Sequence, residues 1–248
     1  MVTSGEPVVL VTGSAQRLGA AIVGRLHDAG FRAAIHYRAS ATAAEALAAR
    51  LNTERADSAA TFAADLLDGA APAALVARVV AHFGRLDALV NNASTFYPTP
   101  LATVTAADWR ALVGSNLEAP LFLAQAAAPH LRARRGVIVN ITDIHSELPM
   151  PGYLVYNVAK AGLQGLTRAL ARELAPEVRV NAVAPGPIAW PLDGQTDEAE
   201  RRRILATVPL GREGGAAQVA EAVKYLVCDA DYVTGHTIAV DGGRSIAI

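Results

Sequence analysis

The sequence predicts an α/β fold in which a doubly wound parallel sheet carries helices on both faces. Short apolar runs alternate with longer amphipathic segments along the whole chain, which is the pattern of successive strand–helix units. The runs are apolar at nearly every position, as at Val137 to Ile141, which is typical of strands buried on both faces. No linker, repeat or low-complexity segment interrupts the pattern, so we expect one domain over residues 1–248.

The predicted strands are short, apolar and separated by helical segments, so we expect them to be parallel. They are Pro7–Thr12, Arg32–Tyr37, Ala59–Ala63, Ala88–Val90, Val137–Ile141, Arg179–Val183 and Thr237–Val240. The predicted helices share the spacing of one apolar face. They are Leu18–Ala29, Ala41–Asn52, Ala71–Phe83, Ala106–Val113, Leu117–Leu131, Tyr153–Leu174, Glu198–Leu205 and Ala217–Val227. The least regular stretch, Pro185 to Asp197, contains several prolines and glycines. Loops at the carboxyl ends of parallel strands surround ligands, so we expect a substrate lid over about 185–205.

The composition indicates an ordered globular chain and excludes several function classes. Hydrophobic residues make up 52% and charged residues 18%, and the net charge of −1 provides no basic field for nucleic acid. We find no signal peptide and no run of roughly 20 apolar residues, so we expect a cytoplasmic protein without membrane spans. Cys228 is the single cysteine, which excludes an intramolecular disulfide, and no cluster indicates a metal. We expect Cys228 to be buried near a helix end.

A glycine-bearing turn follows the first predicted strand, and a helix follows the turn. Gly13 permits a tight turn, and Gly19 permits close packing of the helix. Between them lie Gln16, Arg17 and Leu18, at a helix N-terminus whose N–H groups and dipole suit a pyrophosphate. The turn therefore indicates a dinucleotide cofactor.

The end of the second strand favours NADPH over NADH. An acidic residue at this place holds the ribose hydroxyls in NAD-specific sites, and none is present in His36-Tyr37-Arg38-Ala39-Ser40. His36, Arg38 and Ser40 are instead suited to a 2′-phosphate, and Arg17 adds a second positive charge. Further cofactor contacts are expected from two segments that end later strands. They are Asp65-Leu66, which would reach the adenine, and Asn91-Asn92-Ala93.

Tyr156 and Lys160 lie at the start of the long helix predicted over Tyr153 to Leu174. Their i, i+4 spacing places both side chains on one face. An ammonium close to a phenol favours the phenolate and so lowers the phenol's pKa, which would let Tyr156 exchange a proton with substrate. Lys160 could also hold the ribose of the cofactor.

Motifs spread over essentially the whole chain resemble the short-chain dehydrogenase/reductase family. They are Thr12-Gly13, Asn91-Asn92-Ala93, Asn116, Tyr156 with Lys160, Pro185-Gly186 and Val240-Asp241-Gly242-Gly243. The resemblance implies a Rossmann-like sheet with strand order 3-2-1-4-5-6-7 and a homotetramer. It also implies that Asn116 belongs to a proton relay, and that Pro185, Gly186 and Ile188 line the nicotinamide side.

Two positions depart from the usual pattern of that family. Arg17 stands where the turn usually has its third glycine, and Asp143 stands where a catalytic serine usually lies, thirteen residues before Tyr156. A serine donates a hydrogen bond to a carbonyl oxygen, whereas a carboxylate cannot donate one and would repel an alkoxide. A carboxylate can accept N–H bonds, stabilise a protonated ring nitrogen and keep Tyr156 protonated. Asp143 therefore favours reduction of a ring C=N bond.

Both departures resemble the pteridine reductase branch of the family, as do three segments. They are Thr12 to Gly19, His36-Tyr37-Arg38 and especially Asn91 to Leu101 (NNASTFYPTPL). The resemblance implies that a pterin is sandwiched between the nicotinamide and Phe96, because a flat heterocycle gains from stacking. Ser94 and Arg17 would hydrogen-bond the pterin or bridge it to the cofactor phosphates. Trp190, in the predicted lid, would cover the substrate or serve in packing.

The sequence therefore predicts an NADPH-dependent pteridine reductase. A hydride would pass to a C=N bond of dihydropterin, biopterin or dihydrofolate, and Tyr156, assisted by Asp143 and Lys160, would supply a proton. The alternative enzyme is an NADPH-dependent carbonyl reductase of the same family that carries Asp143 by chance. A non-catalytic NADP-sensing protein is a third hypothesis, but it gives no reason for Asn116, Tyr156 and Lys160 to occur together.

Overall fold

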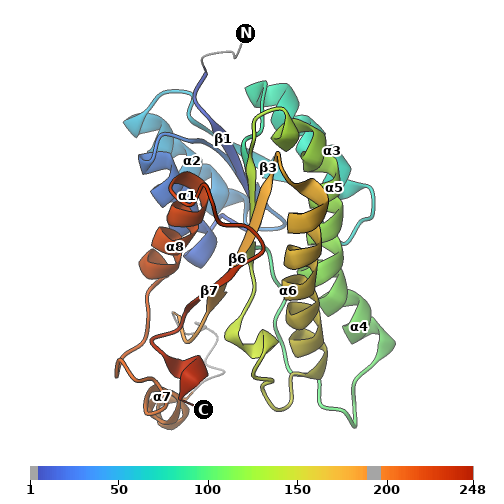
Figure 1. Cartoon of the computed structure of the whole chain (residues 1–248), viewed down its shortest axis with the longest axis vertical. Helices are drawn as coiled ribbons and strands as arrows, with labels where there is room; N and C mark the ends of the chain where they lie inside the picture. The colour runs from blue at the N-terminus through green and yellow to red at the C-terminus, as the bar shows by residue number, and fades with distance from the viewer. Residues whose placement is uncertain (1–4, 189–196, 248) are drawn as a thin grey trace.

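The computed structural model, which describes residues 5–188 and 197–247, contains one seven-stranded parallel sheet (Figure 1). Its strand order, β3-β2-β1-β4-β5-β6-β7, confirms the order expected from the family resemblance. The strands are β1 (Val8–Val11), β2 (Arg32–Tyr37), β3 (Ala59–Ala63), β4 (Ala88–Asn91), β5 (Val137–Ile141), β6 (Arg179–Pro185) and β7 (Thr237–Val240). Because every pair is parallel, the carboxyl ends of all the strands lie at one edge of the sheet.

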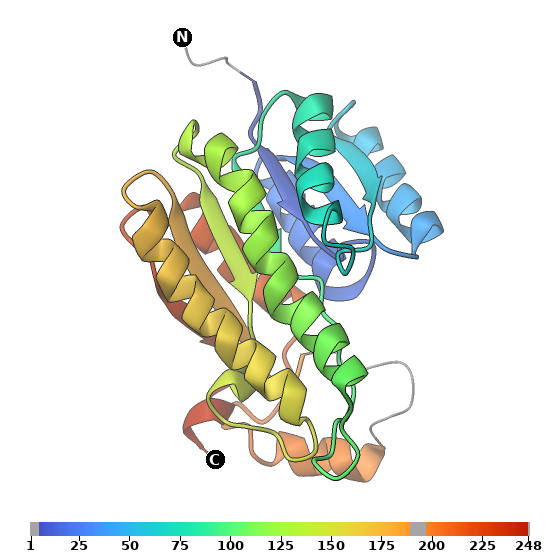
Figure 2. The ribbon, with the colours of Figure 1, turned by 90° about the vertical axis from the view of Figure 1, so that its right-hand side faces the viewer.

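Helices cover both faces of the sheet, as predicted (Figures 1 and 2). One layer consists of α1 (Arg17–Asp28), α2 (Ala41–Glu54) and α8 (Ala216–Cys228). The opposite layer consists of α3 (Ala71–Phe83), α5 (Ala119–Arg132) and α6 (Leu154–Leu174). The remaining helices, α4 (Ala106–Val113) and α7 (Glu198–Leu205), lie toward the end of the molecule where the chain terminates.

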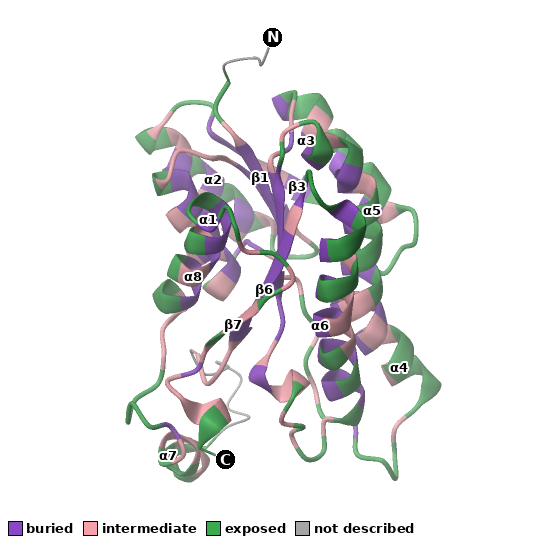
Figure 3. Cartoon of the chain, in the orientation of Figure 1, coloured by how far each residue is buried: buried purple, intermediate pink, exposed green. Residues whose placement is uncertain are grey.

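The core lies in two layers, one on each side of the sheet. The strands at the centre are buried at every position, as the burial colours show (Figure 3). On one side they pack against Ile22, Leu26 and Leu51 from the first helical layer. On the other side they pack against residues such as Leu75 and Leu131. Burial on both faces explains why the strands read as apolar runs rather than as an alternating pattern.

The structure differs from the predicted elements mainly at their ends. The two helices predicted over 106–113 and 117–131 form one continuous rod, because a π-helical turn, η1 (Gly114–Glu118), joins α4 to α5. Two short 3-10 turns, η2 (Ile144–Ser146) and η3 (Arg244–Ile246), had no periodic signal in the sequence. The expectation that Cys228 is buried is wrong, because this last residue of α8 is exposed. Among the described residues no helix is both long and apolar enough to span a membrane.

A chain of buried polar side chains ties the centre of the sheet to α6. Asn91 donates to the Oδ1 atom of Asn140 at 2.8 Å, and Asn140 donates to the Oγ1 atom of Thr167 at 2.9 Å. Thr167 in turn donates to the carbonyl oxygen of Leu163 at 2.8 Å. All three side chains are buried, and these hydrogen bonds replace contacts with water for all their polar atoms except the Oδ1 atom of Asn91, which has no partner among the described residues. These hydrogen bonds therefore fix α6, which carries Tyr156 and Lys160, relative to β4 and β5.

We expect Asn140→Leu to reduce the free energy of unfolding by roughly 2–3 kcal/mol, because it leaves the buried amide of Asn91 without its acceptor. The measurement is urea denaturation followed by circular dichroism. Ile138→Val on the same strand is the control, with an expected loss of about 1 kcal/mol for the missing methylene. An Asn140 variant no less stable than the Ile138 variant would contradict this role.

Candidate active site

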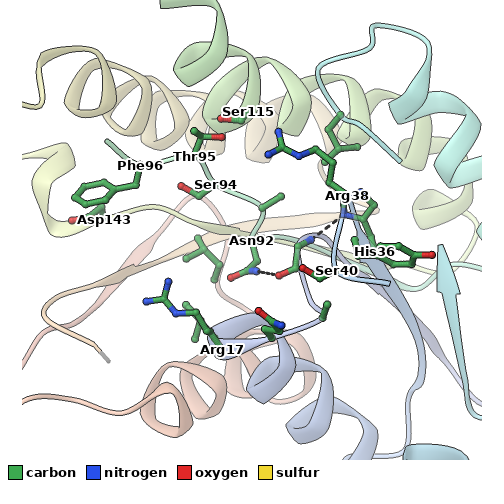
Figure 4. A pocket seen from close by; sticks show the side chains of 18 of the residues that line it. Arg17, His36, Arg38, Ser40, Asn92, Ser94, Thr95, Phe96, Ser115 and Asp143 are labelled. Atoms are coloured by element: carbon green, nitrogen blue, oxygen red, sulfur yellow. Dashed lines mark hydrogen bonds between the residues drawn. The ribbon is translucent and has the colours of Figure 1, made fainter. Parts of the chain in front are cut away.

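A pocket of about 840 Å³ opens at the carboxyl ends of the central strands (Figure 4). It brings together twenty of the residues predicted to bind cofactor or substrate or to act in catalysis. They are Gly13, Gln16, Arg17, Leu18, His36, Tyr37, Arg38, Ser40, Asp65, Leu66, Asn92, Ala93, Ser94, Phe96, Asp143, Tyr156, Lys160, Pro185, Gly186 and Ile188. Three predicted residues are not among them: Asn91 is buried and bonded to Asn140, Asn116 lies behind the pocket wall, and Trp190 falls outside the described residues.

The turn after β1 is held tightly against the end of β4. Gly13 has a φ of +59°, and a Cβ atom there would lie 2.8 Å from the Cα atom of Ala93. The hydroxyl of Thr12 accepts hydrogen bonds from the backbone N–H groups of Asn92 and Ala93, both at 2.9 Å. The side chain of Asn92 donates to the carbonyl oxygens of Thr12 and Gly13, at 2.9 and 3.0 Å. This part of the sequence thus forms one rigid floor for the pocket.

His36 supports the glycine turn, and this differs from its predicted role as a phosphate contact. Its Nδ1 atom accepts a hydrogen bond from the N–H of Gly13 at 3.0 Å, and its Nε2 atom lies 3.2 Å from the carbonyl oxygen of Ala64. Nε2 therefore carries the hydrogen, and the ring is neutral. Burial lowers the pKa of His36 to about 4. A neutral ring with both nitrogens engaged offers no cation to a phosphate, so that expectation is corrected.

The other residues chosen for the cofactor remain suited to it. The N-terminus of α1 has no acidic residue in its first turn, and Gln16 makes no side-chain cap, so its N–H groups can bind an anion. Arg17 and Arg38 reach the pocket from α1 and from the end of β2 (Figure 4). Arg17 has a φ of +53° at the place where the family usually has glycine. Because that conformation costs an L-residue about 1–2 kcal/mol, the guanidinium is retained against a backbone penalty.

Tyr156 and Asp143 form the reactive pair of the site. The hydroxyl of Tyr156 donates to the Oδ2 atom of Asp143 at 2.7 Å, and the Oδ1 atom of Asp143 accepts from the N–H of His145 at 2.9 Å. Lys160 donates to the carbonyl oxygen of Ile141 at 2.8 Å, and its Nζ atom lies 5.6 Å from the centre of the Tyr156 ring. Three of the four predicted catalytic side chains, those of Asp143, Tyr156 and Lys160, therefore lie together between β5 and α6.

The electrostatics of this pair differ from our expectation that Lys160 would lower the pKa of Tyr156. Burial and the negative charge of Asp143 instead raise the pKa of Tyr156 well above its usual value. The same burial lowers the pKa of Lys160 to about 8, although Asp143 acts in the opposite direction. The carboxylate touches the phenol, whereas the ammonium is turned toward Ile141, so the closer charge prevails. Tyr156 is therefore held as a protonated donor.

Phe96 forms an aromatic wall beside this pair. Its ring stacks on Tyr153 at 4.7 Å between centres and 14° between planes, and it meets Tyr156 edge-on at 4.8 Å. Phe96 and Asp143 lie at the same end of the pocket in Figure 4. Phe96 is 40% exposed, which leaves it available for a flat ligand. Tyr153 was not predicted as a site residue, because nothing in the sequence places it behind Phe96.

Asn116 holds the segment that carries Ser94. Its Oδ1 atom accepts from the hydroxyl of Ser94 at 2.6 Å, and its Nδ2 group donates to the carbonyl oxygen of Thr95 at 2.9 Å. It lies in the π-helical turn η1, an irregularity common at functional sites. The proton relay that the family resemblance implies for Asn116 stays a prediction. In the described part of the chain its contacts are to the pocket wall rather than to Tyr156 or Lys160.

The pocket also contains residues that the sequence did not single out. They are Ala15, Ala39, Ala64, Leu67, Thr95, Ser115, Ile141, Thr142 and Ala216. Most are neighbours of predicted residues and could have been found by extending each motif by one position. Ile141 and Ala216 are the exceptions: Ile141 lies two residues before Asp143, and Ala216 begins a helix distant in sequence.

Comparisons with known proteins agree with this geometry. A family model described as enoyl-(acyl carrier protein) reductase matches residues 13–245. The chain belongs to the short-chain dehydrogenase/reductase family, and it is an oxidoreductase by that membership.

Curated relatives within that family differ in the activity that their names describe. Pteridine reductase 1 of Leishmania tarentolae is 41% identical, covering 97% of this chain and 96% of the relative. Ketoacyl reductase 2 of the granaticin polyketide synthase from Streptomyces violaceoruber is 38% identical, with 97% and 96% covered. A 3-oxoacyl-(acyl-carrier-protein) reductase of Staphylococcus aureus is 35% identical, with 94% and 96% covered.

We expect His36 to make the protein less stable as the pH falls from about 6.5 to about 4. Its folded pKa is depressed, so in that window the unfolded chain binds a proton that the folded chain does not. The free energy of unfolding should fall by at most about 1.4 kcal/mol per pH unit from this group. Urea denaturation across the window measures it. His36→Gln cannot titrate and should show a shallower slope; equal slopes would refute the assignment.

We expect Arg17→Gly to have opposite effects on two properties: the variant is more stable than Arg17→Ala, but it binds NADPH more weakly than the parent does. Glycine relieves the left-handed backbone, so this variant should be about 1 kcal/mol more stable than Arg17→Ala, which keeps the strain. Both variants lose the guanidinium and should bind NADPH more weakly than the parent does. Thermal unfolding and NADPH fluorescence titration are the two measurements. If Arg17→Gly bound NADPH as the parent does, the guanidinium would have no role at the cofactor.

Proposed function

We propose that this chain is an NADPH-dependent pteridine reductase that reduces a C=N bond of a dihydropterin, biopterin or dihydrofolate. The observation that carries the proposal is the 2.7 Å hydrogen bond from Tyr156 to Asp143, beside the exposed ring of Phe96. A carboxylate occupies the place from which a carbonyl reductase would donate a hydrogen bond, and an aromatic wall stands next to it. The pteridine reductase relative, at 41% identity over nearly the whole chain, supports the same reading.

The residues around the pocket fit a nicotinamide cofactor with a 2′-phosphate. The N–H groups at the start of α1 would hold the pyrophosphate, and Arg38 and Ser40 would hold the 2′-phosphate. No acidic residue follows β2 to hold a free ribose hydroxyl instead. When bound, this cofactor supplies the hydride.

The chain's own groups then orient the pterin and deliver a proton. Phe96 stacks on one face of the ring, and the hydroxyl of Tyr156 turns from Asp143 to donate to a ring nitrogen. The carboxylate of Asp143, relieved of that bond, accepts an N–H of the pterin. Because the pKa of Tyr156 is raised, its proton is present at neutral pH. The nearby ammonium of Lys160 stabilises the phenolate that remains after transfer.

A carbonyl reductase is the second candidate, and the ketoacyl and oxoacyl reductase relatives favour it. Its chemistry requires a hydrogen-bond donor for the carbonyl oxygen, and an ionised Asp143 beside Tyr156 cannot provide one. The pterin therefore fits the site better than a ketone does. The NADP-sensing hypothesis leaves the buried pairing of Tyr156 with Asp143 unexplained.

We expect the purified protein to oxidise NADPH with dihydrobiopterin or dihydrofolate, and to use NADH less well. Asp143→Ser should lower kcat/KM for the pterin by about 100-fold or more, because the carboxylate that keeps Tyr156 protonated and accepts an N–H of the pterin is lost. NADPH fluorescence titration is the control that cofactor binding survives. Tyr156→Phe should likewise abolish most turnover. Turnover confined to a 3-oxoacyl thioester, or a fully active Asp143→Ser, would overturn the proposal.

We extend the proposal to a homotetramer, as in the family that the chain resembles. Large apolar side chains are exposed on neighbouring helices of one layer, namely Leu121 and Phe122 on α5 and Leu154 and Val158 on α6. Covering them with a second copy would remove this surface from water. Light scattering should give four times the chain mass, and Phe122→Glu should reduce it; a monomeric parent would contradict this assembly.

A further inference from the structure

The loop that carries Phe96 is fastened to the start of α6 by Thr99. The backbone N–H of Thr99 donates to the carbonyl oxygen of Gly152 at 2.7 Å, and its Oγ1 atom accepts from the N–H of Val155 at 3.1 Å. Thr99 is buried, and it also forms an isolated parallel β-bridge with Tyr153. Two segments that lie far apart in the sequence are thus joined by two hydrogen bonds at one buried residue.

Thr99 acts as a helix cap for α6. The first N–H groups of a helix have no partner within the helix, and the side chain at the N-cap position usually accepts from one of them. Tyr153 occupies that position in α6 and makes no side-chain cap. Val155 is the second residue of the helix and Tyr156 is the third, so the hydroxyl of Thr99 binds an N–H next to the proton donor. The Phe96 loop therefore caps the helical turn that carries Tyr156.

The ring of Phe96 makes a second contact with the same end of α6. It stacks on Tyr153, the partly buried residue that precedes the helix, and it meets the ring of Tyr156 edge-on. A stacked pair resists sliding and tilting, because the two faces lose contacts when they separate. Phe96 is therefore fixed to α6 through its own ring and through Thr99, three residues further along the loop.

We propose that Thr99 and Tyr153 are positioning residues, which keep the ring of Phe96 at a fixed distance from the hydroxyl of Tyr156. The inference rests on the proposed function, because that ring is the surface on which the pterin would stack. Neither residue is among the described residues that line the pocket, so both act through Phe96. A pterin stacked on Phe96 must place a ring nitrogen within hydrogen-bond distance of Tyr156, and a displacement of about 1 Å would slow proton transfer.

The experiment measures kcat/KM for dihydrobiopterin in Thr99→Val, which keeps the shape of the side chain but removes the acceptor for the N–H of Val155. We expect kcat/KM to fall about tenfold, because the stacked pterin is no longer held in register with Tyr156. NADPH binding, measured by fluorescence titration, should stay at the parent's value. Thr99→Ser keeps the hydroxyl and should restore turnover.

Thr234→Val is the matched control for this substitution. The Oγ1 atom of Thr234 also accepts from a backbone N–H at 3.1 Å, that of Val180, but it does so near the amino end of β6, at the edge of the sheet opposite the pocket. Thr234→Val should therefore destabilise the protein as Thr99→Val does, while its kcat/KM for dihydrobiopterin stays at the parent's value.

Tyr153 provides a second test that does not depend on the helix cap. Tyr153→Leu removes the stacked ring and should lower kcat/KM for the pterin, whereas Tyr153→Phe retains the ring and should keep most of the activity. A Phe96→Leu background then shows whether Thr99 acts through the ring. Because Phe96→Leu already removes the stacking surface, Thr99→Val should have little further effect on kcat/KM in that background.

Three results would each overturn the inference while leaving the proposed function intact. They are parental turnover in Thr99→Val, a Tyr153→Leu variant as active as Tyr153→Phe, and an undiminished effect of Thr99→Val in the Phe96→Leu background. Equal losses of kcat/KM in Thr99→Val and Thr234→Val would overturn it as well, since they would reflect stability alone. A parent that does not reduce dihydrobiopterin or dihydrofolate would instead overturn the proposed function, and this inference with it.

Discussion

The close contact between the turn after β1 and the end of β4 is the constraint on which the rest of the site depends. Gly13 approaches Ala93 so closely that a side chain is excluded, and Thr12, Asn92 and His36 supply the hydrogen bonds that fix the approach. Because these groups are held from both sides, the N-terminus of α1 is aimed at the pocket without help from a ligand. Because this turn is rigid, the N–H groups at the start of α1 have a fixed position, and that position determines where an anion can bind.

The chemistry depends on a second contact, between Tyr156 and Asp143. Tyr156 is buried and Asp143 is partly buried, so the hydrogen bond between them is stronger than it would be in water, and the charge of the carboxylate acts strongly on the phenol. Lys160, although one helical turn away, is directed to the carbonyl oxygen of Ile141. The site therefore holds Tyr156 as a protonated donor rather than as a phenolate.

Two arginines show where positive charge gathers in the pocket. Arg17 stands in a left-handed backbone conformation at the start of α1, and Arg38 follows β2. Arg17 is retained in a conformation that glycine would occupy at lower cost. Both guanidinium groups line the pocket and suit a ligand with phosphate groups.

The sequence by itself determined the parallel sheet, its helical layers and most of the pocket lining, because these follow from local patterns: apolar runs, glycines in turns, and the spacing of Tyr156 and Lys160. Only the tertiary structure decided what those residues do to one another. It made His36 a neutral support of the glycine turn, and it raised the pKa of Tyr156 by burying this side chain beside Asp143. Burial and the distance between charges govern these effects, and both depend on contacts between segments far apart in the chain.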